Sequence, residues 1–173
     1  MNTKPDKEKF MELIEQNKGI IFTICNSYCK NSDDIDDLSQ DIVYNLWKSF
    51  NSYNTDLKFS TWMYRVALNV AISFCRKGKR LGSKVVYNEQ LIQFETDNDY
   101  EEAENLALLF NFISTLKDMD KSIILLYLEN KTYKEIASIA GISETNVATR
   151  IGRIKVRLKS DFKTAQNKDY GTK

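Results

Sequence analysis

Side chains that can contact nucleic acid are concentrated between residues 143 and 157. Serine, threonine and asparagine can hydrogen-bond to base edges, and arginine neutralises phosphates. The residues of this kind are Ser143, Thr145, Asn146, Thr149, Arg150, Arg153 and Arg157. Helical spacing places most of them on the outward side of one helix, beside Glu144 and Ala148. The chemistry indicated is noncovalent binding of duplex DNA.

The elements that would hold these side chains have the pattern of a helix-turn-helix. Thr132 and Glu135 form a capping box ahead of a short apolar helix. Gly141 can adopt the positive φ of a tight turn, and Ser143 can cap the second helix. That helix would face inward with Val147, Ile151, Ile154 and Leu158. The alternative is an ordinary helical hairpin with a solvated charged face; the capping box, the glycine turn and the basic bias together favour DNA binding.

Residues suited to catalysis or metal binding are scarce. The chain has no histidine, so no Ser-His or Cys-His pair can form, and it contains neither a P-loop nor a GxGxxG motif. Only three thiols, Cys25, Cys29 and Cys75, could serve as soft metal ligands, and a structural zinc site needs four. We predict no enzyme activity, catalytic residue, metal or cofactor, and interpret the cysteines as small buried residues.

Composition favours helix throughout, because Pro5 is the only proline and glycines are few. No run of 18 apolar residues is present, and the polar start of the chain has no secretory pattern. We therefore expect a cytoplasmic, all-α protein without membrane insertion. Net charge is only +1, but basic residues cluster near 76–84 and 131–163, and such patches bind phosphates.

Three helices are predicted in the first half. Apolar spacing from Phe10 to Tyr28 indicates a single amphipathic helix. A second begins at an N-cap at Ser32 and turns inward Ile35, Leu38, Ile42, Leu46 and Phe50. A third runs from about residue 60 to 79, with Met63, Val66, Ala67, Val70 and Phe74 on one side. Its opposite side carries Arg65, Asn69, Ile72 and Arg76.

The stretch that follows separates two small domains. Residues 81–100 show no sustained period, and their polarity and net acidity are typical of a flexible linker. We predict one helical domain over 6–80 and a second over 101–163, with a frayed polar tail beyond. In the second domain, a helix capped by Asp120 would turn inward Ile123, Ile124, Tyr127 and Leu128, ahead of the helix-turn-helix.

Three segments resemble sigma-70-type RNA polymerase sigma factors. Residues 36–47 (DDLSQDIVYNLW) look like the polymerase-binding helix of that family, and 59–69 (FSTWMYRVALN) look like the promoter-melting segment. Residues 133–158 are similar to its C-terminal DNA-binding domain. Two such domains with only a linker between them fit the extracytoplasmic function (ECF) subgroup.

The resemblance implies roles for particular residues. Those matching the helix that docks on the clamp coiled coil of core polymerase are Asp37, Leu38, Gln40, Asp41 and Trp47. Those matching or neighbouring the −10 element surface are Tyr53, Trp62, Arg65, Asn69, Arg76, Lys77 and Arg80. The residues of 143–157 named above would then contact the −35 element, and the polymerase flap would be a further partner. Leu38 and Trp47 are expected to act as apolar anchors, Tyr53 to stack on a base, and Trp62 either to meet the last paired base or to join the core.

Further expectations follow from the same resemblance. The chain would bind promoter DNA in duplex and single-stranded form, and an anti-sigma protein is a familiar partner in this family. Ala148, Gly152 and Asn146 depart from the family's usual residues, so the −35 preference cannot be carried over. The competing hypotheses are a stand-alone helix-turn-helix regulator that binds DNA without polymerase and a helical adaptor with no DNA role.

Overall fold

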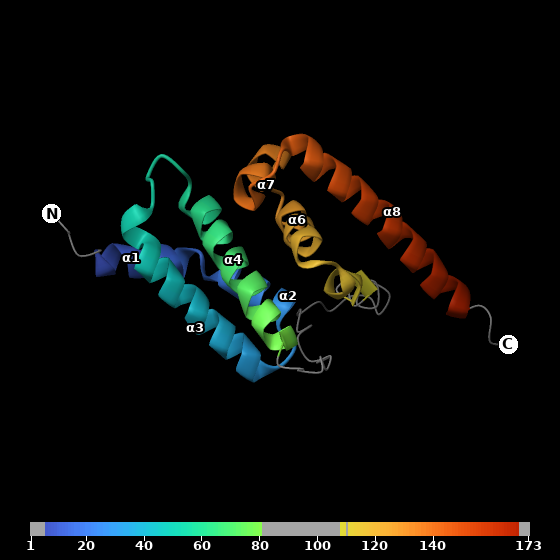
Figure 1. Cartoon of the computed structure of the whole chain (residues 1–173), viewed down its shortest axis with the longest axis horizontal. Helices are drawn as coiled ribbons and strands as arrows, with labels where there is room; N and C mark the ends of the chain where they lie inside the picture. The colour runs from blue at the N-terminus through green and yellow to red at the C-terminus, as the bar shows by residue number, and fades with distance from the viewer. Residues whose placement is uncertain (1–5, 81–107, 110, 170–173) are drawn as a thin grey trace, which may run out of the picture. The chain divides into compact units, whose positions relative to one another are not determined.

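The computed structural model describes residues 6–80, 108–109 and 111–169, and the chain divides into two compact units, Met1–Leu91 and Ile92–Lys173 (Figure 1). Every regular element among these residues is a helix, which confirms the all-α prediction. The linker predicted over 81–100 lies outside the described residues, as does the side chain of Arg80. Within the described ranges, no helix has both the length and the apolar character of a membrane crossing.

The first unit is built from α1 (Lys7–Gln16), α2 (Lys18–Tyr28), α3 (Ser32–Ser49), the short 3₁₀ helix η1 (Phe50–Ser52) and α4 (Phe59–Arg80). Helix α3 packs along α4, and both contact α2 (Figure 1). The core between them is fully buried and includes Ile24, Leu38, Ile42, Leu46 and Met63. This burial leaves the outer faces of α3 and α4 available for binding.

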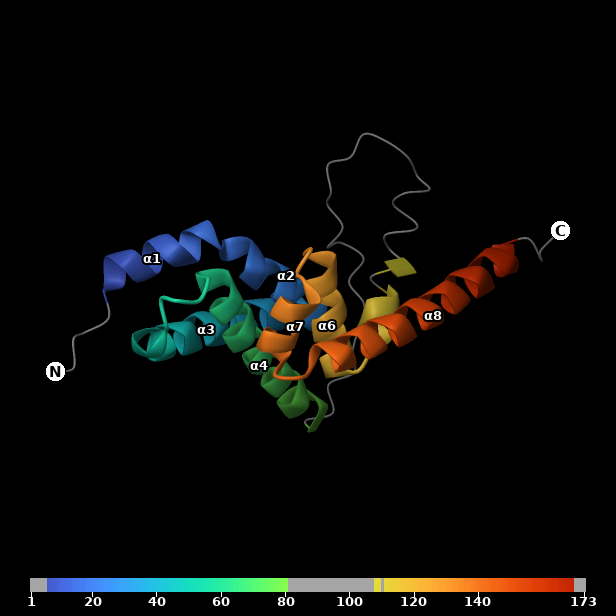
Figure 2. The same ribbon diagram turned by 90° about the horizontal axis from the view of Figure 1, so that it is seen from above.

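The single helix predicted from Phe10 to Tyr28 is wrong, because the chain breaks at Asn17 and changes direction there (Figure 2). Asn17 leaves the helical region, with φ −120° and ψ 14°. Its side-chain amide donates to the carbonyl of Leu13 at 2.8 Å, a carbonyl that a continuous helix would pair with the Asn17 backbone N–H. Asparagine competes in this way for backbone partners, so the helix ends although the apolar period continues.

Two other predictions in the first unit need correction. Asn31, rather than Ser32, caps α3, because its Oδ1 accepts the backbone N–H of Asp34 at 2.8 Å. The buried face of α4 is also rotated from the predicted one and includes Met63, Tyr64, Ala67, Leu68 and Ala71. Val66, Val70 and Phe74 are only half-buried. The rotation arises because α4 must face α2 as well as α3.

The second unit contains a helical stretch at 111–115, then α6 (Asp118–Leu128), α7 (Tyr133–Ala140) and α8 (Glu144–Asp169). The helices α6, α7 and α8 contact one another in every pair. Ile123, Leu126, Ile136, Val147 and Ile151 are almost completely buried where they meet. This three-helix core fixes the orientation of α8, which carries the predicted DNA contacts.

The local features of the helix-turn-helix are confirmed. The Thr132 hydroxyl accepts the Glu135 backbone N–H at 3.2 Å, and the Glu135 carboxylate accepts the Thr132 backbone N–H at 2.9 Å. Gly141 is left-handed at φ 70°, and the Ser143 hydroxyl accepts the Asn146 backbone N–H at 3.2 Å. Each of these bonds spans three residues, which is why the sequence alone could reveal them.

Helix α6 differs from prediction at both ends. Its N-cap is Lys117, and Asp120 lies within the first turn rather than ahead of it. Leu125 and Leu126 are buried, whereas Tyr127 is half-buried and Leu128 is exposed. The helix also begins earlier than expected because Asp118 occupies its first turn, where an acidic side chain suits the helix dipole. At the other end of the unit, α8 continues to Asp169, so the helix extends into the tail that was predicted to fray after residue 163.

Replacing either of two glycines in this unit by alanine should change stability, but in opposite directions, because their backbone conformations differ. Gly141 has φ 70°, so Gly141→Ala should lower the free energy of unfolding by about 1 kcal/mol. Gly152 lies inside α8 with nothing within 4 Å of an added Cβ, so Gly152→Ala should raise it by about 1 kcal/mol. Chemical denaturation of the full chain measures both. Two shifts in the same direction would contradict the conformational explanation.

Candidate polymerase and nucleic-acid interfaces

An open groove of about 460 Å³ lies between α1 and α3. Its lining, defined here as the α1–α3 groove, consists of Lys7, Phe10, Met11, Ser39, Gln40, Val43, Tyr44 and Trp47. Phe10 packs edge-on against Trp47 with ring centroids 5.0 Å apart, which gives the groove an aromatic floor. Met11 and Tyr44 leave 57% and 63% of their surfaces exposed at its sides. Such an apolar groove with polar edges suits a protein segment.

The acidic residues of α3 lie next to this groove. Asp37, Gln40 and Asp41 are exposed, and Trp47 is half-buried. Leu38 is 0% exposed, so the expectation that it acts as an apolar anchor is wrong. It belongs to the core, and Tyr44 supplies exposed apolar surface on α3 instead. The helix therefore offers carboxylates and an aromatic ring to one partner surface.

The loop between η1 and α4 is supported by an aromatic cluster. Tyr53 stacks on Phe50 with centroids 6.3 Å apart, and it lies 5.4 Å from Phe59 and 5.2 Å from Trp62. The Tyr53 hydroxyl donates to the carbonyl of Leu57 at 2.6 Å. Tyr53 and Trp62 are both half-buried, so each ring joins the cluster and keeps part of its surface for a ligand. The cluster thus fixes the conformation of the loop.

The Tyr53 hydroxyl can be tested apart from its ring. Tyr53→Phe removes only the bond to Leu57, and a typical hydrogen bond contributes about 1 kcal/mol, so loop-dependent DNA binding should weaken by roughly fivefold. Tyr53→Ala also removes the ring and should weaken binding further. Binding to single-stranded DNA is the measurement, made in the presence of core RNA polymerase, the partner that the sequence resemblance implies. Equal defects in both variants would contradict a role for the ring, and wild-type binding by Tyr53→Phe would contradict a role for the hydroxyl.

Polar side chains continue along the outer face of α4. Arg65, Asn69 and Arg76 are exposed and recur at helical spacing, and Lys77 is exposed beside them. The row begins close to the aromatic cluster, because Trp62 lies one turn before Arg65. Cations can hold a phosphate backbone while an amide and an aromatic ring contact bases. This combination fits a single strand better than a rigid duplex.

The predicted residues of α8 fall into two groups. Ser143, Thr145, Asn146, Thr149 and Arg153 are exposed, as expected of contacts to DNA. Arg150 is held inside the unit: its Nη1 lies 2.6 Å from Asp120 Oδ1, and its Nε donates to Asn146 Oδ1 at 3.1 Å. The structure therefore brings an α6 carboxylate, which sequence reasoning treated only as a cap, into the predicted DNA-binding face.

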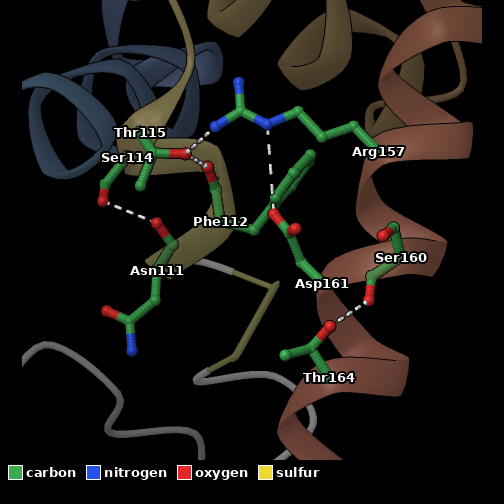
Figure 3. A network of polar contacts seen from close by, with 8 residues as sticks. All are labelled: Asn111, Phe112, Ser114, Thr115, Arg157, Ser160, Asp161 and Thr164. Atoms are coloured by element: carbon green, nitrogen blue, oxygen red, sulfur yellow. Dashed lines mark hydrogen bonds and ion pairs between the residues drawn. The ribbon is translucent and has the colours of Figure 1, made fainter.

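Arg157 is also tied to its own unit (Figure 3). Its guanidinium lies 5.6 Å from the centre of the Phe112 ring, and Nη2 donates to the Thr115 hydroxyl at 3.3 Å. Asp161 lies 3.9 Å from Nε. These contacts fasten the middle of α8 to residues 111–115, so Arg157 is less available to DNA than Arg153.

The three cysteines differ in burial, and Cys25 is among the most buried residues of the first unit. Cys25 and Cys29 are buried, Cys75 is half-buried, and none of the three forms a disulfide. Burial raises the pKa of the Cys25 thiol to about 11, so it is protonated at neutral pH and a poor nucleophile. Among the described residues, no three metal-ligating side chains come together.

Residues missed by sequence reasoning differ in how readily they could be found. Tyr44 follows Asp37 and Asp41 at helical spacing, so its exposed position was accessible from the pattern. The exposure of Met11 could not be predicted, because the apolar spacing predicts α1 and α2 as one helix with a single buried face. Asp120 reaches Arg150 over 30 residues of sequence, and no local pattern signals such a contact.

Comparison with known proteins relates both units to the same protein family. The family model "Sigma-70 region 2" matches residues 13–81, and "Sigma-70, region 4" matches residues 107–158. The chain is 29% identical over 172 residues to the ECF RNA polymerase sigma factor SigW of Bacillus subtilis, covering 92% of each chain. It is 28% identical over 164 residues to the ECF RNA polymerase sigma-E factor of Escherichia coli strain K12, covering 88% of this chain and 85% of that one.

Solved structures show the same fold. CnrH in complex with the cytosolic domain of CnrY aligns with a TM-score of 0.67 at 20% identity, covering 92% of this chain and 91% of that one. The sigma factor RpoE in complex with the anti-sigma factor NepR from Bartonella quintana aligns with a TM-score of 0.65 at 18% identity, covering 93% and 98%. The first matched region contains most of the α1–α3 groove and the α4 row, and the second contains the helix-turn-helix.

Proposed function

Because the chain belongs to the sigma-70 family of RNA polymerase sigma factors, in its ECF group, we propose that its two units divide polymerase docking and promoter recognition between them. The observation that carries this proposal is the presence of both sigma-70 regions, in order, on one chain. Boundaries near 6–80 and 101–163, with a linker over 81–100, suit this division. A sigma factor works where polymerase works, so we expect the protein in the cytoplasm.

In the proposed arrangement, α3 and the α1–α3 groove bind the clamp coiled coil of core polymerase. Exposed carboxylates at Asp37 and Asp41 would attract a basic partner, and Gln40 and Trp47 would contact it directly. Tyr44 and Met11 offer the exposed apolar surface that Leu38 lacks. Aromatic residues that become buried at an interface usually contribute most of its binding energy.

The loop and α4 would capture the unpaired −10 element. Tyr53 and Trp62 offer ring surface for stacking, which is worth about 1–3 kcal/mol per base. Asn69 would pair with a base edge, while Arg65, Arg76 and Lys77 would hold the backbone. Arg80 belongs to the same proposal. Capture of exposed bases offsets the cost of unstacking, so melting is driven by binding and requires no catalytic residue.

The helix-turn-helix would hold the −35 element in the major groove. Thr145, Asn146 and Thr149 lie near the start of α8, where recognition helices contact bases. Ser143 and Arg153 would contact phosphates, and Arg150 would do so through the donors left free by its internal bonds. Arg157 stays in the proposal with a weaker contact, since its described bonds point within the unit. The polymerase flap is the proposed protein partner of this unit.

An anti-sigma protein is a further proposed partner. The structural relative RpoE is seen with the anti-sigma factor NepR, and CnrH is seen with the cytosolic domain of CnrY. Such a protein would compete with polymerase if it covered the α1–α3 groove. The exposed apolar side chains of Met11 and Tyr44 make that groove a suitable target.

The deciding experiment combines the purified chain with core RNA polymerase and genomic promoter fragments. The proposal predicts transcripts that start at defined promoters and depend on the added chain. It also predicts weak binding to duplex DNA when polymerase is absent. Specific duplex binding without polymerase, together with no effect on transcription, would instead identify a stand-alone regulator.

A further inference from the structure

Arg150 is held from two directions before any DNA is bound. Its Nη1 lies 2.6 Å from an oxygen of Asp120 in the first turn of α6, and its Nε donates to Asn146 on its own helix. The two side chains of the ion pair keep 34% and 27% of their surfaces exposed, so the pair sits at the edge of the DNA-binding face. Arg153, three residues later, is exposed.

The two bonds to Arg150 restrict the orientation of its planar guanidinium group. Arginine presents its N–H donors in a rigid planar fork. With Nε and Nη1 fixed by two acceptors, the plane of the fork is set, and the N–H groups of Nη2 can donate outward. A flexible arginine loses side-chain freedom when it binds, whereas a fixed one has lost much of it already. Arg150 is thus prepared for one pose of its ligand.

The Asp120 carboxylate also has an opposite effect. It places a negative charge close to a surface that must meet phosphates, within the range over which charges interact at physiological salt. The ion pair therefore weakens indiscriminate attraction to DNA while it favours one geometry. A residue that served only to attract DNA would not be paired in this way.

We propose that Asp120 is a positioning residue of the −35 interface, which orients Arg150 so that α8 prefers its promoter element over other duplex DNA. This inference rests on the proposed function of α8. Asp120 itself touches no DNA in this arrangement and acts through Arg150 and Asn146.

The test measures how strongly the holoenzyme prefers a selected upstream duplex over a scrambled one. Core polymerase with the wild-type chain first selects duplexes from a pool randomised upstream of the −10 element. The selected duplex and a scrambled duplex of equal length and composition are then the two probes. Asp120→Asn, which removes the charge at constant shape, should reduce the ratio of the two affinities by about fivefold. Asp120→Glu, which keeps a carboxylate, should restore most of that ratio.

Two further variants separate positioning from stability. Asp118→Asn makes the same change in the same turn of α6 and should leave the ratio near the wild-type value. Arg150→Lys keeps the cation but loses the fork, so it should reduce the ratio as Asp120→Asn does, and it serves if Asp120→Asn does not fold. Thermal unfolding of each purified variant chain measures its stability in parallel with the binding experiments.

The outcomes are distinct. An unchanged ratio in Asp120→Asn and Arg150→Lys, or a parallel loss of both affinities, would overturn the positioning role and leave the −35 function intact. A parallel gain in both affinities, with the ratio unchanged, would show that Asp120 is only a competing charge, which also overturns it. If the wild-type holoenzyme selects no upstream sequence at all, the proposed function of α8 fails, and the inference fails with it.

Discussion

Asn69→Ala is expected to slow promoter opening by roughly 5- to 150-fold, the equivalent of a lost amide-to-base pairing of about 1–3 kcal/mol. Asn69 is exposed on α4, in the row that also carries Arg65 and Arg76. Asn69 does not line the α1–α3 groove, so binding to core polymerase should be unchanged. Permanganate reactivity of unpaired thymines in the −10 region measures opening directly.

A matched control is available in the second unit. Asn111 is also exposed, and its recorded hydrogen bond uses the backbone carbonyl, which Asn111→Ala retains. That variant should open promoters at the wild-type rate. If Asn69→Ala behaved like Asn111→Ala, or if it weakened core binding to the same extent as opening, base capture by Asn69 would be refuted.

Asp41→Lys is expected to weaken binding to core polymerase by roughly 30-fold or more, because placing like charges together across an interface costs several kcal/mol. Asp41 is exposed on α3, one turn before Asn45 and close to Tyr44 at the α1–α3 groove. The substitution leaves the buried residues of α3 untouched, so folding should persist. Competition with a labelled wild-type chain for a limited amount of core polymerase measures the loss.

Glu12→Lys provides the same reversal of charge on a neighbouring face. Glu12 is exposed on α1 but does not line the α1–α3 groove, which Lys7, Phe10 and Met11 contact from that helix. Core binding should therefore stay close to wild type. Equal losses in the two variants would point to a general dependence on net charge and would remove the special role of Asp41.

Local features of the fold could be predicted from the sequence because their causes are local. The Thr132–Glu135 capping box, the left-handed Gly141 and the Ser143 cap each depend on residues at most three positions apart. The resemblance to sigma-70 factors likewise rested on contiguous segments, and the family matches confirm it.

The errors arise where distant residues or competing bonds decide the outcome. The apolar period runs through Asn17 without interruption, yet one side-chain bond to Leu13 ends the helix. The rotation of α4 follows from having two neighbours, α2 and α3, which its own sequence does not encode. Leu38 was expected at an interface because its motif position suggested it, whereas its 0% exposure is a property of the assembled core.

The same limit applies to the binding surfaces. Spacing along α8 placed Arg150, Arg153 and Arg157 together as outward cations, and only Arg153 is exposed without a described tie to another helix. Asp120 and Phe112 hold the other two across 30 and 45 residues of sequence. A helical wheel predicts which way a side chain leaves its helix, but not what meets it there.

Phe50 links two surfaces that experiments would treat as independent. Its ring meets Phe10, on the floor of the α1–α3 groove, at 5.1 Å, and meets Tyr53, in the loop before α4, at 6.3 Å. A substitution at Phe50 should therefore produce a pleiotropic phenotype, with defects in enzyme assembly and in strand separation together. A genetic screen that assigns each variant either to an assembly defect or to a strand-separation defect would therefore classify Phe50 variants incorrectly. Suppressors of these variants can arise at the α1–α3 groove or in the loop before α4.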